Sequence, residues 1–423
     1  MNISEVILKI KSGGFNEKFK MLYGDEAKAA ERYIKALEEF EDLYGNRDNI
    51  RLFSAPGRTE VGGNHTDHQH GEVLAGSVDL DVIAIVSANG SGTVRIKSEG
   101  YPMDEIDLGE LEIIKSETGR AAALIRGVCA AFKNNGYSVG GFDAYTTSNV
   151  LKGSGLSSSA AFEVLVANIV NGLFNDKAVD AVTMAKYSQF AEREFFGKPC
   201  GLLDQMASSS GGFTYADFNN PEDPKVEKIE LDIKKSGCTL CVVDTGGNHA
   251  DLTQDYADVT IECKKVSRAL GVEFLRDASE DTFYKSIAVL RNSCGDRAVL
   301  RAFHFFNENR RVEEQEAALK SEDFNTFLRL VNESGESSYK YLQNLYPTSN
   351  PSEQGLCLAI ALTSQFLNGE GACRVHGGGF AGTIQCYIPS NRFAEYKSMI
   401  EAVFGVGSCV EIAIRPVGGY ELD

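Results

Sequence analysis

Three histidines and one aspartate lie close together in the segment "GRTEVGGNHTDHQHG", residues 57–71. They are His65, Asp67, His68 and His70, and they include half of the six histidines in the chain. Such side chains can bind a metal ion, exchange protons, or hydrogen-bond a polar small molecule. The histidine spacing matches no helical zinc motif, which argues against a metal site and leaves the other two uses open.

A glycine- and serine-rich turn, "LKGSGLSSSAAFEVLV" at 151–166, is the strongest signal in the chain. A strand is expected to end near Val150, and an apolar helix follows from about Ala160. The glycines allow a tight turn near a ligand, and the serine hydroxyls add to the free N–H groups at the helix start. One serine would be enough for a helix cap, so the excess predicts a phosphate-binding loop. Its residues are Gly153, Ser154, Gly155, Leu156, Ser157, Ser158 and Ser159.

Two common nucleotide-binding motifs do not account for this turn. The Gly-Lys-Ser/Thr of a Walker loop is missing at that spacing. The G-x-G-x-x-G match "GGGFAG", residues 377–382, precedes the strand-like "TIQCYI" instead of a helix, so it fails as a dinucleotide-binding motif.

Two carboxylates, Glu192 and Asp204, lie twelve residues apart in "AEREFFGKPCGLLDQMASSSGG", residues 191–212. Taken alone, Glu192 could belong to a solvated helix face, with Glu194 as an equal candidate for any functional role. Asp204 could be a helix N-cap. Beside a phosphate loop, however, such carboxylates are the groups that hold a divalent cation and orient an attacking hydroxyl.

Composition limits the classes of function that are open to the chain. Its 423 residues are long for a single core and predict two domains. A net charge of −18 argues against nucleic acid and anionic membrane as partners, because both require clustered Lys and Arg. The start of the chain has no secretory h-region, and no apolar run reaches membrane-span length, so we expect a cytoplasmic protein. Cys238 and Cys241 form a C-x-x-C without a second pair, which predicts buried strand thiols instead of a zinc ribbon.

The elements that must position these residues follow from periodicity and from Gly and Pro punctuation. Residues 25–44 read as an amphipathic helix that ends near Gly45. Further helices are expected over 160–174, 178–196 and 391–404, and the chain from 246 to 367 is mostly helical. The expected strands are 51–56, 73–88, 93–98, 140–150, 211–218, 225–232, 238–246, 372–376, 383–388 and 409–417. We therefore predict an α+β protein with an N-terminal domain over 1–225, including a helical extension over 1–50, and a C-terminal domain over 226–423.

Taken together, the motifs resemble those of the GHMP kinases, which include galactokinase, homoserine kinase, mevalonate kinase and phosphomevalonate kinase. "GLSSSA" is similar to their second motif and "GGGFAG" to their third. "APGRTEVGGNHTDHQHG" resembles the first motif in its galactokinase form, usually Pro-Gly-Arg-x-Asn-Leu-Ile-Gly-Glu-His-Thr-Asp-Tyr. "CGLLDQMAS" resembles the galactokinase segment with the catalytic aspartate. The four motifs occur in the family's order, from residue 55 to residue 382.

The resemblance implies a two-domain fold with the active site in the cleft between the domains. The N-terminal domain would have a mixed sheet, like the second domain of a small-subunit ribosomal protein, and the C-terminal domain would be a ferredoxin-like α/β sandwich. It also implies a galactokinase-type activity, in which ATP and Mg²⁺ serve to phosphorylate the anomeric hydroxyl of galactose. We expect a monomer whose partners are a sugar and ATP.

The resemblance also suggests a role for particular residues. Asp204 would take or orient the proton of the sugar hydroxyl, with Arg58 beside the transferred group. Glu192 and the Ser159 hydroxyl would hold Mg²⁺, and Ser98 is a candidate for contact with adenine. The implied sugar-binding residues are Asn64, His65, Thr66, Asp67, Gly201 and Tyr256.

Several positions depart from the galactokinase pattern. Asn64 replaces a glutamate that, in that family, holds the hydroxyl on the sugar's sixth carbon, and His68 replaces a tyrosine. "TGGNH" lacks a usual arginine, and Ala381 stands where glycine is general. Galacturonate kinases share the Asp-His-Gln stretch found here at 67–69, so galacturonate, arabinose or another C6 or C5 variant remains an alternative substrate. A non-catalytic sensor of sugar and ATP is a second alternative, and Asn64 is the expected substrate-choice residue.

Overall fold

The computed structural model describes residues 1–150, 155–247 and 252–423, so Gly153 and Ser154 of the predicted phosphate loop lie outside the described residues. Three helices begin the chain: α1 (Ile3–Lys11), α2 (Asn16–Tyr23) and α3 (Glu26–Tyr44). The helix α3 confirms the prediction for 25–44, including its end at Gly45. No helix among the described residues is long and apolar enough to cross a membrane.

The described strands of the N-terminal half form an eight-stranded mixed sheet, with the order β12-β1-β2-β5-β3-β4 and with β6 and β7 continuing from β2. Its pairs are antiparallel except β3 with β5, which are parallel. The strands are β1 (Arg51–Gly62), β2 (Glu72–Ala88), β3 (Thr93–Ser98), β4 (Met103–Asp107), β5 (Phe142–Ser148), β6 (Phe213–Asp217), β7 (Lys225–Ile229) and β12 (Tyr420–Leu422).

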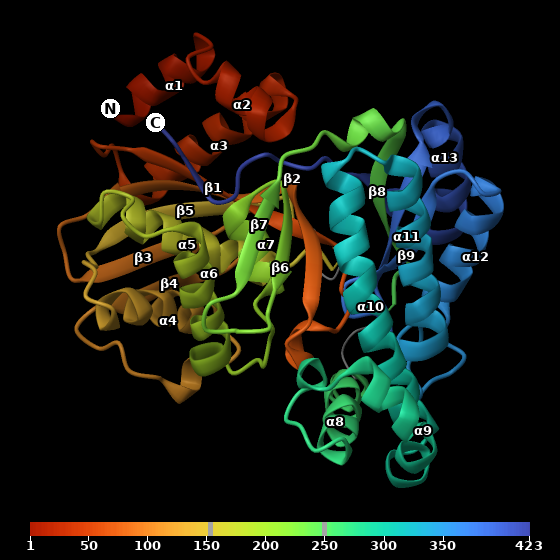
Figure 1. Cartoon of the computed structure of the whole chain (residues 1–423). Helices are drawn as coiled ribbons and strands as arrows, with labels where there is room; N and C mark the ends of the chain where they lie inside the picture. The colour runs from red at the N-terminus through yellow and green to blue at the C-terminus, as the bar shows by residue number, and fades with distance from the viewer. Residues whose placement is uncertain (151–154, 248–251) are drawn as a thin grey trace.

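Helices cover both faces of this sheet (Figure 1). Because successive strand side chains point to opposite faces, Ala84 and Val86 of β2 pack in one core while Ile83 and Ile85 pack against α1–α3. Burial on both faces explains why β2 reads as a nearly continuous apolar run. The other face carries α4 (Ala121–Asn134), α5 (Ser158–Phe174), α6 (Ala181–Phe190), the π-helical turn η3 (Ala191–Phe196) and α7 (Leu203–Ser210).

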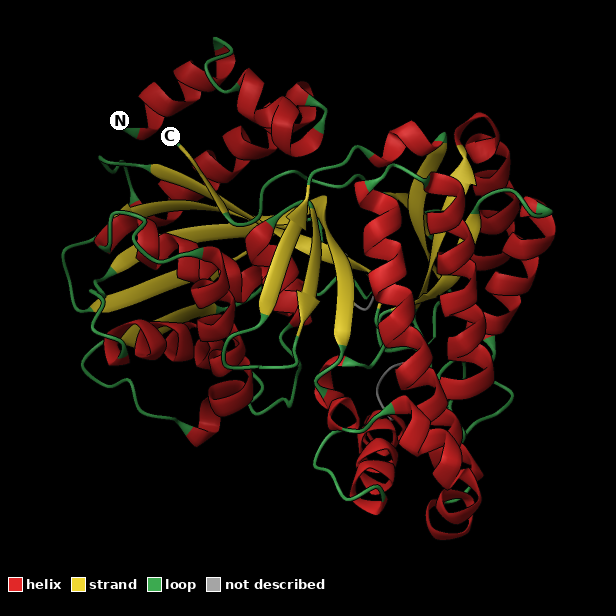
Figure 2. Ribbon diagram, in the orientation of Figure 1, coloured by secondary structure: helices red, strands yellow, loops and turns green. Residues whose placement is uncertain are grey.

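The second sheet is antiparallel, with the order β11-β8-β10-β9, and helices pack against it (Figure 2). Its strands are β8 (Cys238–Asp244), β9 (Ala372–His376), β10 (Thr383–Pro389) and β11 (Cys409–Glu411). The helices of this half are α8 (Thr253–Ala269), α9 (Glu280–Cys294), α10 (Asp296–Lys320), α11 (Phe324–Ser337) with the π-helical turn η6 (Ser338–Leu342), α12 (Gly355–Leu367) and α13 (Phe393–Phe404). Cys238 and Cys241 lie buried in β8, as predicted.

The two sheets correspond to the two predicted halves, but the chain does not divide between them at one point. β7 begins at residue 225 and pairs with β6, so it belongs to the N-terminal sheet. The last strand, β12, returns to pair with β1, and the strand expected over 409–417 is limited to β11. The sequence analysis also missed β4 and α4.

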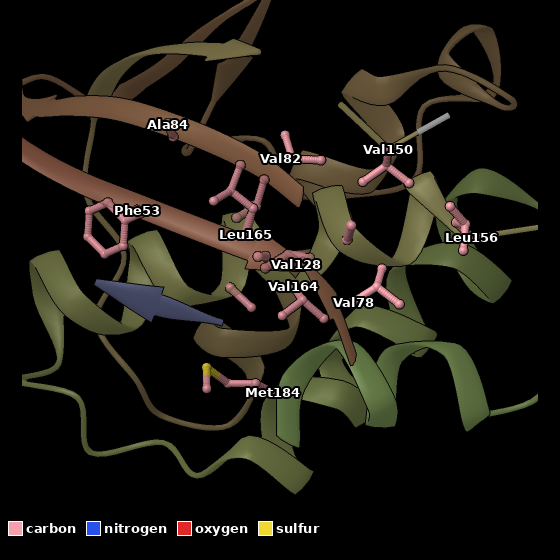
Figure 3. Close-up of a cluster of buried hydrophobic side chains, with 14 of the residues drawn as sticks. Phe53, Val78, Val82, Ala84, Val128, Val150, Leu156, Val164, Leu165 and Met184 are labelled. Atoms are coloured by element: carbon pink, nitrogen blue, oxygen red, sulfur yellow. The ribbon is translucent and has the colours of Figure 1, made fainter. Parts of the chain in front are cut away.

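Figure 3 labels Val150, which precedes the predicted phosphate loop, and Leu156, which belongs to it. Val150 is 4% exposed and Leu156 is fully buried, and both pack in the core between the sheet and α5. Leu156 therefore anchors the described part of the loop to the core just before α5 begins.

Candidate active site

Asp204, in the first turn of α7, faces Arg58 of β1. Arg58 Nε donates to Asp204 Oδ1 at 2.7 Å, and Nη2 lies 2.6 Å from the same oxygen. The Ser157 hydroxyl donates to Oδ2. Burial alone would raise the pKa of Asp204, but the Arg58 charge and the Ser157 hydrogen bond lower it below its ordinary value. The carboxylate is therefore ionised at neutral pH and is oriented through both oxygens.

The first and second motifs dock directly on one another through their backbones. The Arg58 N–H donates to Leu156 O at 3.0 Å. A Cβ at Gly57 would come within 2.7 Å of that same carbonyl, so the glycine is required for this close approach. Ser157 has a left-handed backbone with φ of 55°, which is uncommon for a residue with a side chain and directs the start of α5 toward Asp204.

Glu192 lies in the π-helical turn η3 and is 2% exposed, whereas Glu194 is exposed. The Ser159 hydroxyl donates to Glu192 Oε1 at 3.0 Å, and Lys198 Nζ donates to the same oxygen at 2.8 Å. Glu192 therefore does not belong to a solvated helix face. Turns of π-helix inside α-helices are frequent at functional sites, and this one turns Glu192 inward.

A carboxylate and a hydroxyl side by side are oxygen ligands of the type that Mg²⁺ takes. Within residues 1–150, 155–247 and 252–423, no group of three or more His, Cys, Asp or Glu side chains could hold a metal ion. Ser159 and Glu192 would therefore form only part of a coordination shell, as is usual for Mg²⁺ bound together with phosphates and water.

Asp67 belongs to the short 3₁₀ turn η1 (Asp67–Gln69) and lies against Gly201. A Cβ on Gly201 would lie only 1.5 Å from Asp67 Oδ2, so a side chain there is incompatible with this carboxylate position. Burial, together with the nearby charges of Asp204 and Glu60, raises the pKa of Asp67 to about 7. The carboxylate is thus held close to the segment that carries Asp204.

Three successive carbonyls of the glycine-rich third motif accept side-chain contacts, two from the first motif and one from α8. Asn64 Nδ2 donates to Gly377 O at 2.7 Å, and His65 Nε2 lies 2.8 Å from Gly378 O. The Tyr256 hydroxyl donates to Gly379 O at 2.9 Å. The structure thus brings Asn64, His65 and Tyr256 together, although they come from distant parts of the chain.

The glycines of this segment are needed because its neighbours leave no room for side chains. A Cβ at Gly378 would lie 2.4 Å from the Tyr256 ring, and one at Gly379 would lie 2.1 Å from Asn344 O. Asn344 Nδ2 in turn donates to Asn64 Oδ1 at 2.8 Å and to Gly378 O at 3.0 Å. The sequence analysis missed Asn344, since a single asparagine after a helix carries no motif.

Asn64 and Thr66 differ from the expectation that both contact a ligand. Asn64 is 1% exposed, and besides the Gly377 carbonyl its amide donates to Glu60 Oε1 at 2.8 Å. The Thr66 hydroxyl is fully buried against the carbonyls of Gly63 and Glu72, at 2.9 and 2.7 Å. Both side chains point into the protein, where their hydrogen bonds stabilise the loop of the first motif.

Ser98 and the histidines of the first motif have no common role in the structure. Ser98 ends β3, where its hydroxyl accepts from Thr146 at 2.9 Å. Burial lowers the pKa of His65 to about 4 and that of His68 to about 3, so both imidazoles are neutral at pH 7. Within the part of the chain that the structure describes, neither ring nitrogen of His68 has a hydrogen-bond partner, although both are buried.

Comparison with known proteins agrees with this arrangement. Residues 123–212 match the family described as "GHMP kinases N terminal domain", and residues 38–88 match "Galactokinase galactose-binding signature". The structure is similar to that of Lactococcus lactis galactokinase complexed with galactose, with a TM-score of 0.78 and 22% identity over 91% of this chain and 98% of the other. A mevalonate kinase structure gives a TM-score of 0.61 at 15% identity, over 86% of this chain and 98% of the other, which supports the predicted fold.

Galactokinases are among the proteins whose sequences resemble this chain. A galactokinase from Streptomyces coelicolor is 31% identical over 82% of this chain and 86% of its own length. A galactokinase from Thermotoga petrophila is 31% identical over 81% of this chain and 91% of its own length. The four motifs, the two-sheet fold and these relatives lead to one conclusion: the chain belongs to the galactokinase family of the GHMP kinases.

Proposed function

We propose that the protein transfers the terminal phosphoryl group of ATP to the anomeric hydroxyl of galactose. The observation that carries this proposal is the contact of Asp204 with both Arg58 and Ser157, between the phosphate loop and the loop of Asp67. Asp204, kept ionised, accepts or orients the proton of the attacking hydroxyl. Arg58 stabilises the charge that develops on the transferred group.

Ser159 and Glu192 would hold Mg²⁺, which supplies charge neutralisation to the phosphates when it is bound. Asp67 offers two acceptor oxygens to ring hydroxyls, and the neutral His65 adds one further partner. Gly201 carries no side chain, which lets the Asp67 carboxylate lie directly against the backbone of the segment that leads to Asp204.

The proposal is tested by measuring ADP release with ATP, Mg²⁺ and single sugars: galactose, talose, arabinose, N-acetylgalactosamine and galacturonate. We expect galactose to give the highest kcat/KM and a sugar 1-phosphate as product, identified by phosphorus NMR. A 6-phosphate product would rule out the proposed chemistry. ADP release by none of the sugars would instead favour a non-catalytic sensor of sugar and ATP.

A second candidate substrate is a sugar with a carboxylate at its sixth carbon, such as galacturonate. The position of Lys264 on α8 favours this candidate. Its Nζ lies 5.8 Å from the centre of the Phe274 ring, and its charge acts on His68 and His70. A cation beside the sugar loop is suited to an anionic substituent. A galacturonate kcat/KM above that of galactose in the same assay would select this candidate.

Alanine substitutions at Ser159 and Glu192 should each raise the Mg²⁺ concentration needed for half-maximal activity. The reason is that the two side chains hydrogen-bond one another at 3.0 Å and together form the oxygen surface of the proposed metal site. We expect an increase of about 10-fold or more, with a smaller change in sugar KM. Titrating activity with Mg²⁺ at saturating ATP and sugar measures this, and Glu194→Ala on the exposed side of the turn is the matched control. A change confined to sugar KM would contradict the metal assignment.

Replacing Gly378 with alanine should weaken sugar binding more than ATP binding. The new Cβ would collide with the Tyr256 ring, which lies 2.4 Å away, and would displace the residues that contact this segment. We expect sugar KM to rise by about 10-fold, in line with a packing cost of about 1–3 kcal/mol. Gly92→Ala is the control, because no heavy atom lies within 4 Å of a Cβ there. Equal KM values for sugar in the two variants would refute the role of this contact.

Sugar affinity should fall as the pH drops below about 7. The pKa of Asp67 is raised to about 7 in the free protein, so its carboxylate gains a proton below that pH and loses part of its capacity to accept hydrogen bonds. In the parent, kcat/KM for sugar should therefore decline on the acid side of about pH 7, which forms an acid limb in the pH profile. Asp67→Asn should remove this acid limb and lower kcat/KM at the pH values where the parent is fully active. An acid limb that persists unchanged in Asp67→Asn would assign it to another group.

A further inference from the structure

Glu163 is a buried carboxylate to which the proposed function gives no role. It lies on α5, one turn after Ser159, and is fully buried. Its Oε2 accepts from Gln205 Nε2 at 3.1 Å, but its Oε1 has no hydrogen-bond partner within residues 1–150, 155–247 and 252–423. A buried carboxylate oxygen without a partner is costly, so it requires an explanation.

The surroundings of Glu163 join it to the proposed magnesium ligands. Helix positions four apart share one face, so Ser159 and Glu163 face the same neighbours. The Gln205 amide nitrogen that reaches Glu163 also donates to Glu192 Oε2 at 2.7 Å. Two carboxylates thus lie within reach of a single NH₂ group, and Gln205 directly follows Asp204 in α7.

This group of side chains contains two carboxyl groups but only one basic partner. Lys198 pairs with Glu192 at 2.8 Å, and its side chain is 55% exposed, whereas Glu163 has no basic partner in the described part of the chain. Neighbouring carboxylates repel one another strongly in a poorly solvated site. A divalent cation beside Ser159 and Glu192 would relieve that repulsion, so the unpartnered oxygen of Glu163 fits such a cation.

We propose that Glu163 is a positioning carboxylate of the magnesium site, which orients Glu192 through Gln205 and adds its unpartnered oxygen to the surroundings of a hydrated cation. The inference rests on the proposed function for the presence of Mg²⁺. Groups in this outer position fix the direct ligands and typically change metal affinity by about 10–100-fold when they are lost.

The test measures metal binding apart from turnover. Mn²⁺ binding to the full-length protein in the presence of ADP is followed by electron paramagnetic resonance, and the metal-free melting temperature is recorded for each variant. Glu163→Gln keeps the shape and the Gln205 contact but removes the ionisable carboxyl group. We expect its Mn²⁺ Kd to rise at least about 10-fold with the metal-free melting temperature unchanged or raised, and Glu163→Asp to recover part of the affinity.

Glu194→Gln on the exposed side of η3 is the matched control and should bind Mn²⁺ like the parent. A Glu163→Gln Kd within about threefold of the parent value would overturn the assignment, and so would an equal loss in Glu194→Gln. Failure of the proposed function has a different signature. In that case the parent binds Mn²⁺ with ADP, and the Glu163→Gln effect on Mn²⁺ is still seen, but no sugar is phosphorylated.

Discussion

Asp204→Asn is expected to lower kcat by about 10²–10⁴-fold, the range typical of a lost general base. The amide keeps the shape of the carboxylate and one oxygen for the bond to Arg58, but it can no longer take a proton. The residues of the Asp67 loop are unchanged, so the Kd for sugar should stay within a few-fold of the parent value. Coupled ADP release gives kcat, and isothermal calorimetry with sugar gives the Kd.

The control for this substitution is Asp223→Asn, an exposed aspartate outside the site that should retain full activity. An Asp204→Asn protein with kcat within about tenfold of the parent would remove Asp204 from the role of base. Loss of sugar binding together with turnover would instead show that Asp204 has a structural role in the sugar site.

Asn64→Glu is expected to destabilise the protein instead of simply restoring the common galactokinase residue. In the galactokinase pattern quoted above, Asn stands at the position of Glu60 and Glu at that of Asn64, so this chain has the two exchanged. The two side chains touch at 2.8 Å in a site where neither is more than 5% exposed. A second carboxylate there would replace a hydrogen bond with repulsion and cost about 3 kcal/mol of unfolding free energy.

The double variant Glu60→Asn/Asn64→Glu separates this explanation from a general intolerance of position 64. The double variant again pairs one amide side chain with one carboxylate, in exchanged positions. It should therefore recover most of the stability that Asn64→Glu loses. Recovery should be incomplete, because Arg374 Nη2 pairs with Glu60 at 3.0 Å and would lose that partner. Urea unfolding of the parent, both single variants and the double variant measures the coupling. A double variant no more stable than Asn64→Glu would show that the two positions are independent.

The sequence predicts a role in substrate choice for Asn64, and the structure gives this residue a different role. Its amide bonds Glu60, Gly377 and Asn344, so it holds the sugar loop to the glycine-rich segment from within. Asn64 does differ from the galactokinase pattern. Because its side chain is buried, it can affect substrate choice only by changing the position of His65 and its neighbours.

The sequence by itself determined the features that depend on local chemistry. The helix α3, the long strands β1 and β2 and the start of α5 follow from apolar periodicity, capping and glycine placement, which act over a few residues. Four motifs in order were enough to predict the family and the residues that would surround phosphate and sugar. These features need no knowledge of distant parts of the chain.

Only the tertiary structure decided which side chains meet and which way they face. Arg58 and Asp204 are 146 positions apart, and Asn64 and Asn344 are 280 apart, yet each pair is in contact. The pairing of β12 with β1 and the lack of a hydrogen-bond partner for Glu163 Oε1 likewise depend on how distant elements pack. Side-chain direction in a loop is fixed by whichever buried polar groups must be satisfied, and those groups come from the whole fold. For this reason the sequence could assign Asn64 to the loop of the first motif but could not show that its side chain points inward.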